Sequence, residues 1–218
     1  MKPIRKIPSD QLQKRRPLRR FMQWLSKVLF WILTDLEIEG EENFPETGPL
    51  LMVGNHFSMV DVAAFVRVAP YPVEFIGGAL PANTPGFMTV IPRLWGILPV
   101  FRGTGSHFAL REAEKVLKKN GVVAIFPEGG SHARQLRPAR PGAAFLAAHS
   151  SAQLLPIGLI GMDEVFEHLG RFKRAKIRIR VGKPFGPFEV TGRGRERRRQ
   201  LDEISEEIMQ QIAALIPE

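Results

Sequence analysis

The chain has 218 residues, enough for one α/β domain with a large core, and 44% hydrophobic and 24% charged residues indicate a globular protein. It contains no cysteine, which excludes disulfides, thiolate metal sites and cysteine nucleophiles. The net charge of +9 gathers in residues 1–20, 171–183 and 193–199. Clustered basic charge favours a polyanionic partner, such as anionic lipid, nucleic acid or a phosphorylated substrate, with an ordinary solvated surface as an equal alternative.

The first predicted element is an apolar helix over residues 21–36, preceded by several arginines. At 1.5 Å per residue it is roughly 24 Å long, short of a hydrocarbon core of about 30 Å. Its polar residues share one narrow stripe: Gln23, Ser26, Lys27 and Thr34. A broad apolar face with Trp24 and Trp31 beside basic residues predicts a helix lying in a membrane interface. The alternatives are a core helix and a signal peptide, although no small-residue cleavage site follows.

Short apolar runs alternate with helical patterns through the rest of the chain. Strands are predicted at residues 36–39, 50–54, 73–76, 98–101, 122–126, 154–160 and 176–181, and helices at 58–68, 106–120, 140–150 and 196–215. This order predicts a single α/β domain with a largely parallel mixed sheet flanked by helices. We expect a basic tail and interfacial helix in residues 1–35 and the main domain in residues 36–218.

One predicted strand has a basic face, because Lys176, Arg178 and Arg180 alternate with apolar residues. Glu37 and Glu39 alternate in the same way on the first predicted strand. These carboxylates would face the basic side chains if the two strands were neighbours.

His56 and Asp61 follow the strand predicted at residues 50–54. Residues five apart differ by about 140° around a helix, so the two side chains cannot share one helical face. They can meet if the helix begins at Ser58, with the histidine in the preceding loop and the aspartate in the first turn. A neutral imidazole could then take a proton from a hydroxyl while the carboxylate fixes its tautomer. The alternative is a capping box from Ser58 to Asp61 with no catalytic role.

A second motif, Phe126-Pro127-Glu128-Gly129, follows the strand predicted at residues 122–126. Together with Asn55-His56-x4-Asp61 it resembles the glycerolipid acyltransferase superfamily, particularly the bacterial 1-acylglycerol-3-phosphate acyltransferases. Two further segments look similar to family motifs: the apolar run that ends at Arg102, and Pro156 inside an apolar strand. The resemblance covers about residues 45–165.

The resemblance implies roles for six residues. His56 would be the general base and Asp61 its orienting partner. Glu128 and Gly129 would belong to the acceptor and acyl-binding region, with the Gly129 amide as a weaker oxyanion donor. The last two are phosphate-binding arginines: Arg102 and Arg140.

The chain departs from the family pattern after Gly129, where it has Gly130-Ser131-His132 in place of Thr-Arg-Ser. Arg134 or Arg137 could compensate for the missing arginine. The departure leaves the acceptor open: a lysolipid with another headgroup, a sugar or an amino-lipid hydroxyl is an alternative.

The resemblance implies an O-acyltransferase at the cytoplasmic face of the cell membrane, peripheral or monotopic. It would move a fatty acyl group from acyl-CoA or acyl-ACP to a lysophospholipid, with 1-acylglycerol-3-phosphate as the expected acceptor and phosphatidic acid as product. We expect no metal, no cofactor beyond the acyl donor, and no nucleic acid partner; the chain has no G-x-S-x-G elbow and no phosphate-binding P-loop. The rival hypothesis is a non-catalytic basic protein that binds nucleic acid or anionic lipid.

Overall fold

The computed structural model describes residues 16–46, 48–78, 94–100, 106–130 and 135–216. The helices are α2 (Arg16–Leu33), the short 3₁₀ helix η1 (Glu41–Asn43), α3 (Asp61–Val68), α5 (Ser106–Leu117), α6 (Pro141–Ser150), α7 (Val165–Gly170) and α8 (Gly194–Ala213). The strands are β1 (Thr34–Glu39), β2 (Leu50–Gly54), β3 (Glu74–Gly78), β4 (Leu98–Val100), β5 (Val122–Ile125), β6 (Gln153–Ile160) and β7 (Ala175–Val181).

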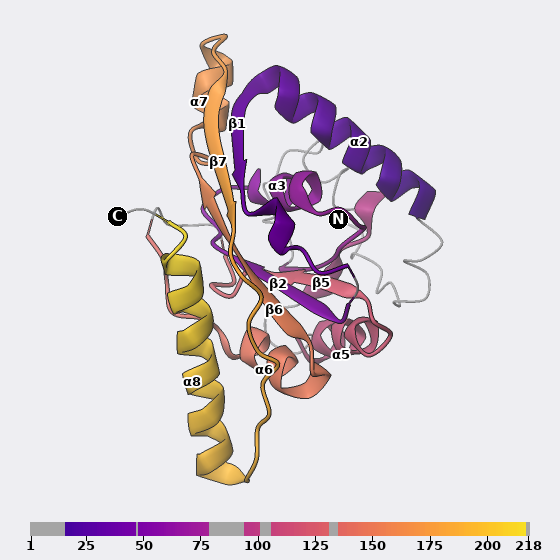
Figure 1. Ribbon diagram of the computed structural model, residues 1–218, viewed down its shortest axis with the longest axis vertical. Helices are drawn as coiled ribbons and strands as arrows, with labels where there is room; N and C mark the ends of the chain where they lie inside the picture. Colours follow the sequence, from indigo (N-terminus) through magenta and orange to yellow (C-terminus); the bar gives the residue numbers. More distant parts are fainter. Residues whose placement is uncertain (1–15, 47, 79–93, 101–105, 131–134, 217–218) are drawn as a thin grey trace, which may run out of the picture.

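These strands form one mixed sheet in the order β1-β7-β6-β2-β5-β3-β4 (Figure 1). Every neighbouring pair is parallel except β6 and β7, which are antiparallel. The central strand β2 is buried throughout, as expected for a parallel strand covered on both faces. The predicted α/β domain with a largely parallel mixed sheet is therefore confirmed.

Helices cover both faces of the sheet, and the sheet divides the core into two layers (Figure 1). On one face, α2, α3 and α7 bury Phe30, Phe65 and Val165 against the strands. On the other face, α5, α6 and α8 contribute small and β-branched side chains, among them Ala144 and Ile208. The carboxyl end of β2, where the first motif begins, lies between these two layers.

The predicted pairing of the acidic and basic strands is confirmed, because β1 lies beside β7 in parallel register. Arg178 Nε lies 2.6 Å from Glu37 Oε2, and Arg180 Nε lies 3.0 Å from Glu39 Oε2. Exposed pairs of this kind add little to stability, because water and salt screen them. Their charged side chains also protect the edge strand β1 from pairing with another chain.

Several predicted helix boundaries are wrong by a few residues, and helix α7 was not predicted. The first helix ends at Leu33, three residues early, because Thr34–Glu39 pair with β7 as strand β1. Helix α3 begins at Asp61, not at Ser58, and the residues between them form a turn in which the Asp61 amide donates to Ser58 O. The division of the chain at residues 35 and 36 stays a prediction.

The amino end of α2 is tied to the protein body by Arg19, which is only 1% exposed. Its guanidinium forms a bidentate pair with the carboxylate of Glu74 on β3, and its Nε donates to Trp95 O at 2.9 Å. The arginines before this helix were expected to supply charge beside a membrane, but Arg19, one of them, forms a buried ion pair instead. Losing either partner of such a pair typically costs about 3–5 kcal/mol.

Two residues of the polar stripe of α2 face the protein, whereas Lys27 on the same stripe is exposed. Gln23 Nε2 donates to Tyr71 O at 3.0 Å, and Ser26 Oγ donates to Ala63 O on α3 at 3.2 Å. Between them and the strand, Phe30 joins the core. The apolar side of the helix is therefore turned outward.

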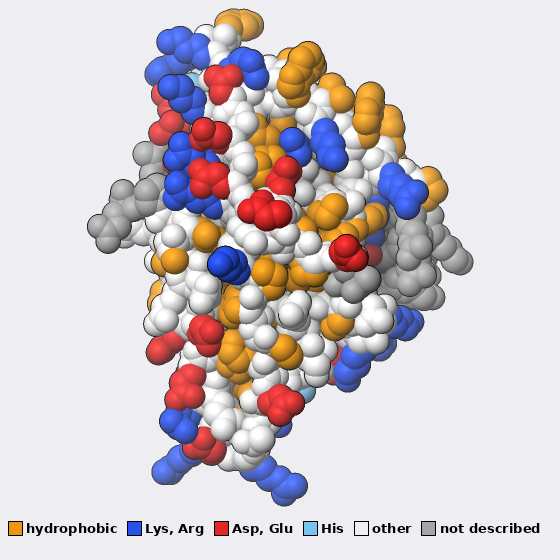
Figure 2. Space-filling model, viewed as in Figure 1, with side chains coloured by type: hydrophobic (Ala, Val, Ile, Leu, Met, Phe, Trp, Pro, Cys, Tyr) orange, Lys and Arg blue, Asp and Glu red, His pale blue; other side chains and the backbone are white. Residues whose placement is uncertain are grey.

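Seven large apolar residues lie exposed on this outer side of α2 (Figure 2). We call them the outer apolar face: Leu18, Phe21, Trp24, Leu25, Leu29, Trp31 and Ile32. A soluble monomer rarely leaves so many neighbouring apolar side chains exposed without a function, so a binding surface is indicated. Within the described ranges, no helix is both long enough and apolar enough to cross a bilayer.

Candidate functional site

The predicted contact between His56 and Asp61 is present. His56 lies in the loop after β2 and Asp61 is the first residue of α3, with His56 Nδ1 2.9 Å from Asp61 Oδ2. The aspartate is fully buried, whereas the imidazole retains 14% exposure. Because Asp61 occupies Nδ1, the other ring nitrogen, Nε2, is the one free to exchange a proton with a reactant.

Asp61 also satisfies backbone donors, as the capping-box alternative expected, although α3 begins at Asp61 and has no side-chain cap. Its Oδ2 accepts hydrogen bonds from the amides of Phe57 and Ser58, both at 2.7 Å. These bonds hold the loop that carries His56 close to the first turn of α3. The carboxylate therefore holds the loop before the helix and orients the histidine at the same time, so the two roles are not exclusive.

Burial sets the electrostatics of Asp61. Removal from water raises the pKa of its carboxyl above the ordinary value, while the hydrogen bonds from His56, Ser58 and Phe57 oppose that rise. Its second oxygen, Oδ1, is buried and has no hydrogen-bond partner among the described residues. Nearly all stabilisation of the ionised carboxylate thus comes through Oδ2, the oxygen that contacts the histidine.

Asn55 and Gly54 fix the position from which the histidine leaves the sheet. The Asn55 side chain makes two hydrogen bonds with the backbone of Leu159 on β6, at 2.7 and 2.8 Å. At Gly54, a Cβ would lie 2.7 Å from the Phe65 ring and 2.8 Å from Ile157 O, so any larger residue would push α3 away from the strand. The residue before His56 is therefore a structural clamp between two strands.

The second motif contacts the first directly. The His56 ring stacks on Phe126, with ring centroids 4.2 Å apart and an interplanar angle of 17°. Glu128 Oε1 accepts the His56 amide at 3.0 Å, and its Oε2 accepts the Arg137 amide at 3.0 Å. The two motifs, about seventy positions apart in the chain, thus form one site at the carboxyl ends of β2 and β5.

Glu128 is buried and joins three loop segments through its two oxygens. Burial raises the pKa of its carboxyl, and the amides of His56 and Arg137 oppose that rise. In this structure both carboxylate oxygens already accept backbone hydrogen bonds, which makes Glu128 a residue that positions the histidine loop. Its assignment to acceptor binding stays a prediction.

Gly129 has a left-handed backbone with φ of 71°, which favours glycine. A Cβ at this position would lie 2.5 Å from Cδ and Nε of Arg140, so the missing side chain lets this arginine pack against the loop after Glu128. The Gly129 amide donates to Phe126 O at 3.1 Å, and its predicted contact with an oxyanion stays a prediction. The phosphate-binding role predicted for Arg140 stays a prediction, now with its side chain placed beside the site.

Three predicted features fall outside the described residues: Arg102, the departure at Ser131, and Arg134. Two contacts at the site were not predicted, although their residues lie within the recognised motifs: the stacking of Phe126 on His56 and the hydrogen bonds of Asn55 to Leu159. The larger cavity found among the described residues, of about 610 Å³, lies on the outer strands β1 and β7 and is lined by none of the predicted site residues.

The geometry supports general-base chemistry. A buried carboxylate holds one nitrogen of a partly exposed imidazole, so the other can accept a proton from a hydroxyl nucleophile. Ser58 is largely buried, and its Oγ lies 3.3 Å from the Val60 amide, within the turn that precedes α3. The arrangement suits direct attack by a substrate hydroxyl activated by His56, with no acylated serine in the protein.

Comparisons with known proteins identify the family of the chain. A family profile described as Acyltransferase matches residues 35–160. The 1-acyl-sn-glycerol-3-phosphate acyltransferase of Bacillus subtilis is 23% identical over 159 residues, which cover 72% of this chain and 77% of that protein. The protein of that name from Borreliella burgdorferi is 23% identical over 144 residues, covering 64% of this chain and 57% of the relative.

A solved structure supports the fold. The 1-acyl-sn-glycerophosphate acyltransferase PlsC of Thermotoga maritima matches with a TM-score of 0.64 and 22% identity, covering 94% of this chain and 84% of that one. The profile matches more than half of the chain, and the chain belongs to the acyltransferase family. The enzyme class predicted from the two motifs is confirmed.

Proposed function

We propose that this acyltransferase moves a fatty acyl group from acyl-CoA or acyl-ACP to the free hydroxyl of 1-acylglycerol-3-phosphate, giving phosphatidic acid. The observation that carries the proposal is the His56–Asp61 pair, buried on the Asp side and open on the His side. His56 Nε2 takes the proton of the acceptor hydroxyl as its oxygen attacks the thioester carbonyl. Asp61 stabilises the resulting imidazolium, which then gives the proton to the departing thiolate.

Arginines near the histidine loop would bind the acceptor's phosphate. Arg140 packs over Gly129, and Gly129 follows Glu128, whose carboxylate holds the His56 amide. A guanidinium matches phosphate oxygens with two parallel hydrogen bonds. Arg102 is the second candidate on the family resemblance. The donor thioester is the co-substrate, and the proposed mechanism needs neither a metal nor another cofactor.

We place the enzyme on the cytoplasmic face of the cell membrane, as a peripheral or monotopic protein with the outer apolar face of α2 in the interface. The support is the orientation of α2. Polar side chains of this helix donate hydrogen bonds to the protein body, which leaves Phe21, Trp24 and their apolar neighbours facing outward. Ser26 on the same helix bonds to Ala63, two residues beyond Asp61. A helix that lies on lipid would therefore hold the His–Asp pair close to the membrane surface.

The test of the reaction is acceptor-dependent thiol release from a long-chain acyl-CoA, measured with a panel of acceptors. We expect release with 1-acylglycerol-3-phosphate and at least about tenfold less with lysophosphatidylcholine or lysophosphatidylethanolamine, because only the first offers an unshielded phosphate monoester to the arginines. The departure at Ser131 supports the rival acceptor, a lyso-aminolipid or another hydroxyl lipid. Faster release with such a lipid would replace the acceptor and keep the chemistry.

The membrane proposal predicts that Phe21→Glu with Trp24→Glu weakens binding to vesicles by about 10–100-fold. The two rings stack at 5.9 Å and are each more than half exposed, so their transfer to the interface would contribute roughly 1.5–3 kcal/mol together. Vesicle flotation measures the effect, with Gln210→Glu plus Ala213→Glu on α8 as a control of equal charge. Point substitutions are preferable to deleting residues 1–34, because deletion would remove Phe30 from the core and leave Glu74 without Arg19.

A further inference from the structure

A small cavity lies where the carboxyl end of α2 meets α3 and the outer strands. It has a volume of about 140 Å³ and is lined by Trp31, Thr34, Leu36, Arg67 and Arg174. Pockets for whole ligands usually measure about 300–1,000 Å³, so this one suits a single compact group. None of its lining residues belongs to the His–Asp site.

The cavity is lined by two guanidinium groups and by no carboxylate. Arg67, in the last turn of α3, has its Nε buried without a hydrogen-bond partner among the described residues. Buried polar groups are almost always paired, so a lone guanidinium nitrogen beside a cavity calls for an explanation. A guanidinium with no acidic partner among the described residues favours the binding of an anion in the cavity that it lines.

Arg174 is held at the mouth of the cavity by the end of α2. It donates to the carbonyl oxygens of Trp31, at 2.8 Å, and of Thr34. A cation is favourable at a helix carboxyl end, and these bonds fix the guanidinium at the border of the outer apolar face. Trp31 belongs to that face and is 76% exposed. The basic cavity and the apolar face therefore share a residue.

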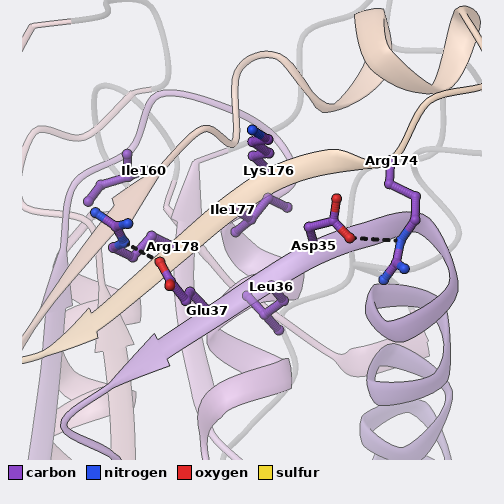
Figure 3. Close-up of a pocket in the computed structure, with 8 residues that line it drawn as sticks. All are labelled: Asp35, Leu36, Glu37, Ile160, Arg174, Lys176, Ile177 and Arg178. Carbon is purple, nitrogen blue, oxygen red and sulfur yellow. Dashed lines mark hydrogen bonds and ion pairs between the residues drawn. The ribbon is translucent and has the colours of Figure 1, made fainter.

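The larger neighbouring cavity is different, because carboxylates line it and pair with two of its arginines (Figure 3). Asp35 pairs with Arg174 Nε at 3.2 Å, and Glu37 pairs with Arg178 at 2.6 Å. The two cavities adjoin at Leu36 and Arg174. Anion binding is thus favoured in the small cavity, where Arg67 has no acidic partner in the described part of the chain.

We propose that Arg67 and Arg174 bind the phosphate of an anionic phospholipid headgroup, in the membrane on which the outer apolar face of α2 rests. The site builds on the docking part of the proposed function and adds a specific lipid contact to it. Arg67 contributes a guanidinium whose Nε has no partner among the described residues, and Arg174, although paired with Asp35, lines the other side of the cavity. Trp31 lies against the adjoining interface. The occupied site would also fix the rotation of α2 on the membrane.

Vesicle binding of Arg67→Gln, Arg67→Lys and Lys27→Gln tests the site. Lys27 is exposed on α2 and does not line the cavity, so Lys27→Gln reports the diffuse attraction of a basic residue to an anionic surface, about fivefold per charge. On vesicles of phosphatidylcholine with phosphatidylglycerol, we expect Arg67→Gln to lose a further tenfold or so. At about 1 M salt, where the screening length is about 3 Å, the Lys27→Gln deficit should vanish and the Arg67→Gln deficit should remain.

Arg67→Lys separates a guanidinium site from a charge effect, because lysine keeps the charge and lacks the planar fork. We expect it to behave like Arg67→Gln at high salt. Full recovery by lysine, or identical behaviour of the Arg67→Gln and Lys27→Gln variants at both salt concentrations, would overturn the proposal. Binding of inorganic phosphate that is lost in Arg67→Gln while vesicle binding is unchanged would also overturn it, since the ligand would then be free phosphate.

Acyl transfer and vesicle binding are measured separately, so the test of the headgroup site does not depend on the proposed reaction. Acyl transfer to a detergent-solubilised acceptor should be unchanged in Arg67→Gln, which shows that the variant folds. Vesicle binding needs no substrate, so a failure of the proposed reaction would leave this test intact. Failure of the wild type to bind any vesicle would contradict the docking proposal, and the headgroup site with it.

Discussion

Replacing His56 by alanine is expected to lower the rate of acyl transfer by about 10²–10⁴-fold, the usual contribution of a positioned general base. The expectation follows from the geometry, since the described site presents one imidazole whose Nδ1 is bound by a buried carboxylate. Thiol release from acyl-CoA in the presence of 1-acylglycerol-3-phosphate measures the effect. The KM for the acceptor should change little, because the histidine acts on the proton being transferred.

A second substitution separates loss of the base from loss of packing. His56→Asn keeps a side-chain N–H near the position of Nδ1, which can still donate to Asp61, but it has no group that accepts a proton at neutral pH. It should be as inactive as His56→Ala and closer to the wild type in melting temperature. His168→Ala on α7 is the matched control, because it removes a histidine outside the site. Turnover retained by both His56 variants would remove this residue from the mechanism.

Local patterns were enough to predict most of the fold. The buried strand at residues 50–54 and the helix after Ser106 could be recognised because apolar runs, caps and glycines are local signals. The alternation of Glu37 and Glu39 with apolar residues matched that of Arg178 and Arg180, so even one strand pairing could be anticipated. The contact between His56 and Asp61 followed from a spacing that only a loop and a first helical turn allow.

Contacts between distant segments could not be predicted in this way. The partner of Arg19 is Glu74, and nothing in the sequence around either residue selects the other. The outward orientation of the α2 apolar face depends on carbonyl groups of α3 and the following loop, which a helical pattern does not contain. The cavity between Arg67 and Arg174 likewise exists only because β1 and β7 bring Arg174 to the end of α2.

For Glu128, the sequence motif identified the residue but not its structural role. Its motif identified the residue, and the family resemblance assigned it to substrate binding. The structure adds that its two oxygens hold the amides of His56 and Arg137. A carboxylate with both oxygens in use stabilises the loop geometry on which the histidine depends, and this could not be foreseen without the fold that brings the two motifs together.

Asp61→Asn should separate activity from stability. The amide keeps an oxygen that can accept hydrogen bonds from the backbone N–H groups of Phe57 and Ser58. It has no negative charge, however, so it cannot stabilise an imidazolium at His56 as the carboxylate does. We expect acyl transfer to fall by about 10²–10⁴-fold, as for His56→Ala. Asp61→Ala is the contrasting variant, since it leaves two buried amides unpaired and should lose about 1–3 kcal/mol of unfolding free energy for each.

The raised pKa of Asp61 gives the stability of Asp61→Asn a defined pH dependence. A carboxyl whose pKa is higher in the folded protein stabilises the fold fully at pH below its unfolded value, and that stabilisation is lost as the pH rises through the folded value. At pH 7 the buried charge therefore costs stability, and the asparagine variant should melt at the same temperature as the wild type or higher. The difference should shrink or reverse as the pH is lowered toward the folded pKa, above the ordinary 3.8, because the wild type then gains a proton that asparagine cannot bind. Thermal melting of both proteins across this pH range measures the difference. If the Asp61→Asn variant became more stable than the wild type as the pH fell, burial would not be destabilising the charged carboxylate of Asp61.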